Sequence, residues 1–205
     1  TIDSMRDITT SQESHILFST PFKEEDMVFN RTFWMDRGGI IRGHYDKTHL
    51  FSRTGEDRLF HPGGSLKIFE MDGVPVGVLT CYEIRYPELS RALSGSGAGV
   101  IVNSVQWPEF RIEQWLTLLR ARAIENQLFV AGANICGTSG MYKMGGRTSV
   151  FEPYGDLAGS LGSDPGCMKA LLDPQKIERF REKIQMDYDR RSIDRVDRIS
   201  SNNDY

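Results

Sequence analysis

Cysteine is scarce in this sequence, and its few cysteines lie far apart. The 205 residues include three, with no CxxC pair: Cys81, Cys136 and Cys167. An odd, sparse set is typical of a reducing compartment and does not suit a disulfide framework, so we expect a cytoplasmic protein. The four histidines show neither HxxxH nor Cys/His spacing, so we expect no metal site.

An excess of one charge and a long apolar run are also missing. The net charge is −3, from 25 basic and 28 acidic residues, which argues against nucleic acid as the main partner because phosphate binding requires a basic surface. No apolar run approaches ~18 residues, so we expect no membrane span. The N-terminus shows no charged-then-apolar leader, so we expect no signal peptide. The length suits a single domain, placed at residues 1–205, with a polar tail in the last dozen residues.

What the sequence does have is a series of short strand and helix patterns. Apolar or β-branched runs bounded by turn residues predict strands at 15–22, 28–36, 40–45, 66–71, 74–81, 100–102, 128–134, 149–152 and 168–173. Helices are predicted at 87–94, 111–126 and 174–184, with Asp173 capping the last. Asp72 and Gly73 form a hairpin signal. Hairpins mixed with helices, and strands that are buried on both faces, predict an α/β sandwich.

The strongest nucleophile candidate is Cys81, because an apolar strand pattern ends there and a helix pattern with an early proline follows. A helix start offers free N–H groups and partial positive charge, which favour a thiolate and an oxyanion. The alternative is a small buried hydrophobic residue, which is the role of most cysteines. The polar residues that follow Cys81 favour the reactive role. Cys136 and Cys167 lack this setting and are interpreted as structural.

A cysteine nucleophile needs a base and a group that stabilises negative charge. His49 is the default base by residue type, and Lys47 lies two positions before it. If this segment is extended, alternation places both side chains on the same side. Glu56 precedes a Gly/Pro-rich loop, which is either a surface turn or a loop that carries a carboxylate into a pocket. A solvated surface lysine is the plain alternative for Lys47, and the residues alone leave these interpretations open.

Two motifs make the chain resemble the nitrilase superfamily of carbon–nitrogen hydrolases. Residues 81–89 (CYEIRYPEL) are similar to the nucleophile motif of that family, with Glu83 where aspartate is usual and Tyr86 where phenylalanine is usual. Residues 45–51 (YDKTHLF) resemble its lysine motif.

Two further segments resemble the same family, in the same order. Glu56 precedes a Pro-Gly pair at 62–63, where the family carries a second glutamate, and residues 120–127 (RARAIENQ) resemble one of its helix ends. The resemblance covers about residues 15–193, most of the chain. It implies a four-layer α-β-β-α sandwich, a small-molecule amide substrate, no cofactor, and a homo-oligomer such as a homodimer.

Carried over residue by residue, the resemblance implies a catalytic set of three. Cys81 is the nucleophile that forms a thioester acyl-enzyme. Lys47 stabilises the tetrahedral oxyanion together with the backbone N–H of Tyr82, and Glu56 orients the site. A nearby ammonium also lowers the pKa of a thiol, and a cation beside a backbone donor forms an oxyanion hole. His49 is then a packing or hydrogen-bonding residue, and a Cys–His hydrolase is the alternative.

The same resemblance implies an acyl pocket and a substrate class. Gln106 and Trp107 lie at a turn that lines the acyl pocket in the family, although Trp107 is interpreted equally well as a core aromatic residue. Arg85 resembles the branch that hydrolyses ω-amides of dicarboxylates, so we expect release of ammonia from a small ω-amide such as 2-oxoglutaramate. Its carboxylate needs a cation, for which Arg85, Arg111 and Arg147 are candidates, although a structural ion pair is the more common role for each of them. Deaminated glutathione and N-carbamoyl amines are the alternative substrates.

One part of the family pattern has no counterpart in the sequence. The general-base glutamate of the family lies well upstream of the lysine, and only 46 residues precede Lys47. Glu13, Glu24 and Glu25 do not follow an apolar strand in a Pro-Glu context, and none is assigned. We expect the chain to be N-terminally truncated, without the first strand, first helix and second strand of the fold. A non-catalytic member that acts only through its oligomer surface is therefore an alternative.

Overall fold

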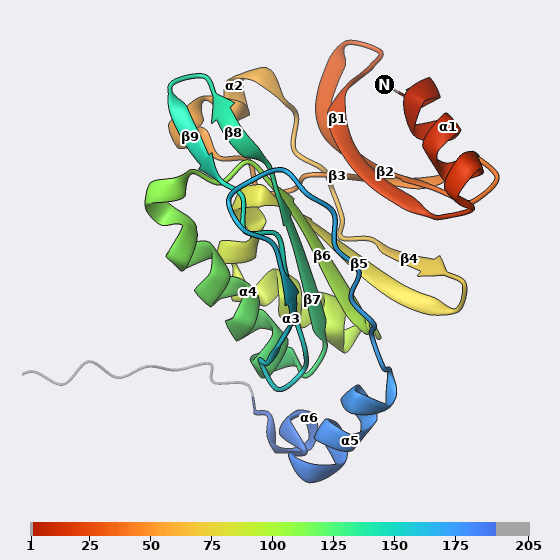
Figure 1. The fold of residues 1–205 in the computed structure, drawn as a ribbon, viewed down its shortest axis with the longest axis vertical. Helices are drawn as coiled ribbons and strands as arrows, with labels where there is room; N and C mark the ends of the chain where they lie inside the picture. Colours follow the sequence, from red (N-terminus) through yellow and green to blue (C-terminus); the bar gives the residue numbers. More distant parts are fainter. Residues whose placement is uncertain (1, 192–205) are drawn as a thin grey trace, which may run out of the picture.

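The computed structural model describes residues 2–191. It is built around a sheet of six strands, which lies between the other layers in Figure 1. The strand order is β11-β10-β7-β6-β5-β4. The strands are β4 (Ile68–Met71), β5 (Val74–Thr80), β6 (Val100–Val105), β7 (Phe129–Asn134), β10 (Ser149–Phe151) and β11 (Leu157–Ser160). The central strands β5, β6 and β7 are parallel, and the outer strands pair antiparallel. The polar tail predicted for the last dozen residues lies outside the described residues.

A three-stranded antiparallel sheet covers one face of the larger sheet. Its strands, in the order β1-β2-β3, are β1 (Ile16–Glu24), β2 (Met27–Met35) and β3 (Ile41–Asp46). Tyr45 of β3 is fully buried and packs with Phe69 and Val78 of the larger sheet. The two sheets therefore share an apolar core.

Helices cover the two outer faces. Helices α3 (Pro87–Gly95) and α4 (Ile112–Asn126) pack on the other face of the six-stranded sheet, where Trp115 and Leu119 of α4 are fully buried. Helix α1 (Ile2–Gln12) lies against β2. Figure 1 shows the layers in sequence: α3 and α4, the larger sheet, the smaller sheet, and α1. The predicted four-layer α-β-β-α sandwich is confirmed. The smaller of its two sheets consists of the three strands β1, β2 and β3.

The remaining elements are short or lie near the C-terminal end of the described residues. They are η1 (Ser52–Thr54), α2 (Glu56–Leu59), η2 (Cys81–Arg85), η3 (Glu109–Arg111), β8 (Cys136–Ser139), β9 (Tyr142–Gly145), α5 (Gln175–Lys183) and α6 (Met186–Asp189). The segments after the parallel strands β5 and β6 meet at one edge of the sheet, which is where sites form in α/β folds. Asp173 lies one residue before the N-cap of α5, which is Pro174, and not at the cap as predicted, although its Oδ1 accepts the N–H of Gln175 at 3.0 Å.

Three segments differ from the sequence predictions. Residues 168–173 form no strand, and β10 pairs instead with β11. The reason is local: the turn at 153–156, closed by the Gly155 N–H donating to Glu152 O at 2.7 Å, returns the chain directly along β10. The unassigned polar N-terminal segment forms α1, and no sequence pattern predicts the β8–β9 hairpin.

Candidate active site

Cys81 lies on a strained turn directly after β5. The strand ends at Thr80, and η2 begins at Cys81, whose φ is +50°. A non-glycine residue in this left-handed region costs of order 1–3 kcal/mol and persists where its surroundings fix it. A capping box fixes it here: the Thr80 hydroxyl accepts the Glu83 N–H, and the Glu83 carboxylate accepts the Thr80 N–H. The turn holds a partly buried thiol at the end of a central strand.

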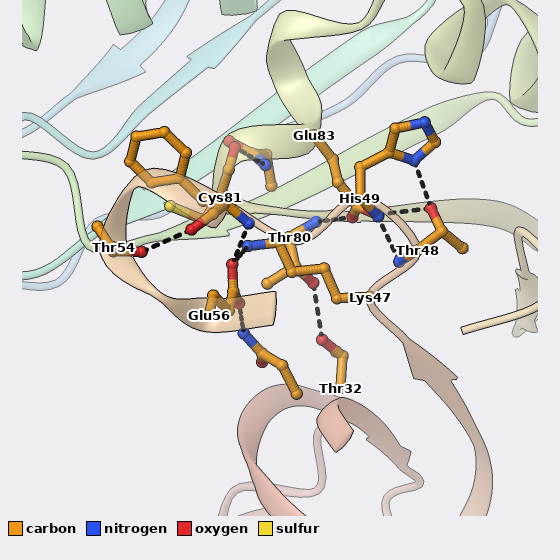
Figure 2. A network of polar contacts seen from close by, with 12 residues as sticks. Thr32, Lys47, Thr48, His49, Thr54, Glu56, Thr80, Cys81 and Glu83 are labelled. Carbon is orange, nitrogen blue, oxygen red and sulfur yellow. Dashed lines mark hydrogen bonds and ion pairs between the residues drawn. The ribbon is translucent and has the colours of Figure 1, made fainter. Parts of the chain in front are cut away.

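Opposing influences act on the Cys81 thiol. Burial is the largest and raises its pKa above the usual value. The Lys47 ammonium and backbone hydrogen bonds from Gln106 and Tyr82 lower the pKa, whereas the Glu56 carboxylate raises it. Lys47 and Glu56 therefore lie close enough to the thiol to act on its charge. The structure brings the three side chains of the predicted catalytic set into one region (Figure 2).

Lys47 and Glu56 form a buried ion pair. Lys47 Nζ lies 2.6 Å from Glu56 Oε2, and the two side chains are 2% and 12% exposed. Glu56 Oε2 also accepts the backbone N–H of Phe51 at 2.7 Å, and Oε1 accepts the amide of Asn30 at 2.8 Å. Figure 2 shows dashed contacts meeting at the Glu56 carboxylate. Both oxygens of Glu56 are therefore occupied by donors.

These donors determine the ionisation of Glu56. Burial by itself raises the pKa of the carboxyl, but the bonds from Lys47, the Phe51 N–H and Asn30 outweigh it and hold the pKa below its usual value. Glu56 is therefore ionised at neutral pH and poorly suited to take up a further proton. Its position suits it to fix the Lys47 ammonium.

Tyr82, Gln106 and Trp107, the candidate substrate-binding residues, are placed in different ways relative to the thiol. Tyr82 and Gln106 reach Cys81 through their backbones, and the Tyr82 ring stacks on Phe51 with centroids 4.5 Å apart. Trp107 is 4% exposed, and its indole N–H donates to Arg111 O at 2.9 Å. Trp107 is therefore held in the protein core, directly after Gln106, whose backbone lowers the pKa of the thiol.

The three candidate arginines differ in their partners. Arg85 lies over the Trp107 ring at 4.7 Å and donates to the neutral amide of Gln114 at 3.2 Å. Arg147 is neutralised by an ion pair with Glu113. Arg111 lies over the Phe110 ring at 5.0 Å. Among residues 2–191, neither Arg85 nor Arg111 forms an ion pair with a carboxylate.

His49 does not face the thiol. Its Nδ1 lies 2.9 Å from Thr48 Oγ1, and its ring packs against Tyr86 with centroids 4.6 Å apart. Figure 2 shows the imidazole turned away from the Cys81 sulfur. The expectation that His49 and Lys47 share one side is wrong, because β3 ends at Asp46 and the following residues bend instead of continuing as a strand.

Two residues near the site could not be assigned from the sequence. Asn30 is an ordinary strand residue in the sequence, and only the fold places its amide on Glu56. Glu83 is fully buried, and its carboxylate accepts hydrogen bonds from the two segments that carry Cys81 and Lys47. The available signal for Glu83 was an acidic residue beside the nucleophile in the motif at 81–89.

The upstream glutamates are not part of this site. Glu24 pairs with Arg31 at 2.9 Å, and Glu13 and Glu25 are exposed. Over the described range 2–191, no group of three or more His, Cys, Asp and Glu side chains is placed to hold a metal ion. Within that range, no helix combines the length and apolar character needed to cross a membrane.

Comparison with known sequences identifies a family and a relative. The family model for carbon-nitrogen hydrolases matches residues 1–182 of the chain. The 2-oxoglutaramate amidase of Bacillus subtilis (strain 168) is 36% identical over 166 residues, which make up 81% of this chain and 64% of that protein. The chain thus spans less than two thirds of the length of this relative.

Two solved structures share the fold. XC1258 from Xanthomonas campestris, a CN-hydrolase superfamily protein with an arsenic adduct in its active site, superposes with a TM-score of 0.86 at 26% identity, over 94% of this chain and 75% of that one. A mutant of the amidase from Nesterenkonia sp. AN1 has the acetamide moiety of fluoroacetamide added covalently at its active-site cysteine. It superposes with a TM-score of 0.78 at 25% identity, over 91% of this chain and 72% of that one.

Proposed function

This chain belongs to the carbon–nitrogen hydrolase family, and we propose that its Cys81 site hydrolyses the amide bond of a small carboxamide, releasing ammonia and a carboxylic acid. The observation that carries the proposal is the strained cysteine turn beside the buried Lys47–Glu56 pair. A nucleophile, a fixed cation and backbone donors in one place are the parts that acyl transfer requires.

The proposed reaction has two steps. The Cys81 sulfur attacks the amide carbonyl, and the resulting oxyanion is stabilised by Lys47 and the Tyr82 N–H. The tetrahedral adduct breaks its carbon–nitrogen bond, ammonia leaves with the thiol proton, and a thioester remains. Water then cleaves the thioester and returns the proton to sulfur.

Proton transfer needs an acceptor other than Glu56, because both of its oxygens are occupied. The family pattern implies a further glutamate for this step, and Glu13, Glu24 and Glu25 do not supply it. The alternative from the sequence analysis, a family member that binds through its oligomer surface without turnover, is therefore kept as an outcome of the test.

For the substrate, we propose an ω-amide that carries a distal carboxylate. The Bacillus relative is a 2-oxoglutaramate amidase. Arg85 offers a guanidinium on the Trp107 ring with a neutral amide as its other partner. The Arg85 guanidinium is therefore available to a substrate carboxylate. The Arg147 guanidinium is not, because it already forms an ion pair with Glu113. Deaminated glutathione and N-carbamoyl amines remain in the test panel.

Ammonia release from 2-oxoglutaramate tests the proposed function. We expect turnover by the chain and a loss of at least about a thousandfold in Cys81→Ala, because the acyl-enzyme cannot form. Cys167→Ala, at an exposed cysteine, serves as the matched control and should keep full activity. Equal rates in Cys81→Ala and the unchanged chain would contradict the mechanism. Absence of turnover on the whole panel would favour the non-catalytic alternative, and loss of acylation in His49→Ala but not in Lys47→Met would favour a Cys–His hydrolase.

Replacing Arg85 by glutamine is expected to raise KM for 2-oxoglutaramate by about 10- to 100-fold, the range of one hydrogen bond to a charged group. KM for a neutral amide such as propionamide should change little. Arg147→Gln is the matched control, because that guanidinium is already paired with Glu113. Steady-state kinetics on both substrates measure the effect, and an equal change in KM for the two substrates would count against a carboxylate site at Arg85.

A further inference from the structure

Glu83 is a carboxylate in the protein interior that the proposed reaction does not use. It is 0% exposed. Its Oε1 accepts the Tyr45 hydroxyl at 2.7 Å, the Thr48 N–H and hydroxyl at 2.8 Å each, and the His49 N–H at 3.0 Å. Its Oε2 accepts the Thr80 N–H at 2.7 Å. Five donors therefore surround one buried side chain.

The donors come from the two segments that carry the proposed chemistry. Thr80 directly precedes Cys81, while Thr48 and His49 directly follow Lys47. One carboxylate oxygen thus binds the nucleophile turn, and the other binds the lysine segment. Figure 2 shows Glu83 between these two segments.

No cation forms an ion pair with Glu83 among the residues that the structure describes. A buried carboxylate without a cation is tolerated only where short hydrogen bonds replace its hydration. The Tyr45 phenol remains a donor, since burial and the nearby Glu83 charge raise the pKa of Tyr45. The five bonds are therefore what keeps the carboxylate in place, and they link the two segments firmly.

The turn at Cys81 makes this link important. The φ of +50° at Cys81 is unfavourable for a non-glycine residue, so the turn relaxes unless it is held. The capping box holds it through the same Glu83 carboxylate. Loss of Glu83 would release the turn and free the Lys47 segment at the same time.

We propose that Glu83 is a positioning residue that fixes the Cys81 thiol relative to the Lys47 ammonium. The proposal rests on the proposed function only in its assignment of Cys81 and Lys47 as the reacting pair. Glu83 does not touch the substrate and acts through these two residues.

A double-mutant cycle on the reactivity of Cys81 tests the proposal. The readout is the rate of iodoacetamide alkylation of Cys81 at pH 7, followed by peptide mass spectrometry, with the exposed Cys167 in the same sample as internal reference. Lys47→Met should slow alkylation by about tenfold, because removal of a nearby cation raises the pKa of the thiol and lowers the fraction present as thiolate. In the Glu83→Gln background the same substitution should slow it less than about threefold, because the ammonium is no longer held beside the thiol.

Two variants separate positioning from general stability. Glu152→Gln is the matched control, because Glu152 is a largely buried carboxylate paired with Lys176 at 2.5 Å, and it should leave the Lys47 effect unchanged. Tyr45→Phe combined with Thr48→Val removes two donors to Glu83 with little change in volume. In this background, Lys47→Met should slow the alkylation of Cys81 by an amount between the values for the unchanged chain and for Glu83→Gln. Circular dichroism shows whether Glu83→Gln folds. If it does not, the Tyr45→Phe/Thr48→Val double variant tests whether Glu83 is a positioning residue.

The outcomes are distinct. A tenfold Lys47 effect that persists in folded Glu83→Gln, or in the Tyr45→Phe/Thr48→Val pair, would overturn the proposal and leave Glu83 with a structural role only. The proposal would also be overturned if Lys47→Met, as the only substitution, did not slow the alkylation of Cys81. Because alkylation requires no turnover, a chain that releases no ammonia would refute the proposed function and still allow the role of Glu83 to be decided.

Discussion

Replacing Lys47 by methionine is expected to lower the free energy of unfolding by about 3–5 kcal/mol, because Glu56 then becomes a buried carboxylate without its cation. The Lys47 side chain is 2% exposed and lies 2.6 Å from Glu56, so water does not readily take its place. Methionine retains much of the volume of lysine, and the loss therefore reports on charge more than on a cavity. Urea-induced unfolding at pH 7 measures the difference.

The loss should depend on pH in a defined direction. In the unchanged chain the pKa of Glu56 lies below its usual value, so its contribution to stability is present above the unfolded pKa and is lost as the pH falls through the folded pKa. In Lys47→Met the same carboxyl lacks its ammonium, its pKa rises, and its ionisation opposes folding. The stability difference between the two proteins should therefore shrink as the pH falls from about 7 to about 4.

A surface lysine provides the control for this prediction. Lys143 lies 2.7 Å from Glu109 and is 65% exposed, so Lys143→Met should change the free energy of unfolding by less than about 1 kcal/mol. A loss in Lys47→Met no larger than in Lys143→Met, or one that is constant across the pH range, would refute the buried ion pair.

Replacing Gly63 by alanine is expected to destabilise the chain by at least about 3 kcal/mol, because the added methyl group has no space. A Cβ at this position would lie 2.1 Å from Asp46 O and 2.8 Å from Asp46 C, which are backbone atoms that cannot rotate away. The Gly63 N–H also donates to Lys47 O at 2.9 Å. The clash therefore displaces the backbone at Asp46, which directly precedes Lys47. Because the Lys47 ammonium acts on the Cys81 thiol, the alkylation rate of Cys81 should change together with the free energy of unfolding.

The next residue is a close control for Gly63. A methyl group added at Gly64 would meet no atom within 4 Å, and neither glycine has a positive φ. Gly64→Ala should therefore change the free energy of unfolding by less than about 1 kcal/mol in either direction. Urea unfolding of both variants decides the matter, and equal losses would show that space at Gly63 is not the reason for glycine there.

Local patterns were sufficient for most of the central strands and for the helices that pack on them, whereas the four-layer arrangement was implied by the family resemblance. The strand before Cys81 and the helix around Trp115 follow from apolar periodicity, which depends only on the residues of each segment. The strand predicted at 168–173 is wrong because an apolar run does not specify its partner, and the short turn at 153–156 favours β11. The helix at the N-terminus was not assigned because it is polar and contributes a single buried residue, Thr9.

The candidate site divides in the same way. The sequence by itself determined the chemical types and their order: the nucleophile candidate Cys81, the cation Lys47 and the carboxylate Glu56, because each belongs to a short motif that resembles one of the family. Only the tertiary structure decided what they do to one another, such as the burial of the ion pair and the turning of His49 away from the thiol. These contacts join segments that are distant along the chain, and no local pattern records which donors will meet a given carboxylate. Glu83 is the clearest case. Its sequence position shows only an acidic residue two positions after a cysteine, whereas folding surrounds its carboxylate with donors from the segments that carry Cys81 and Lys47.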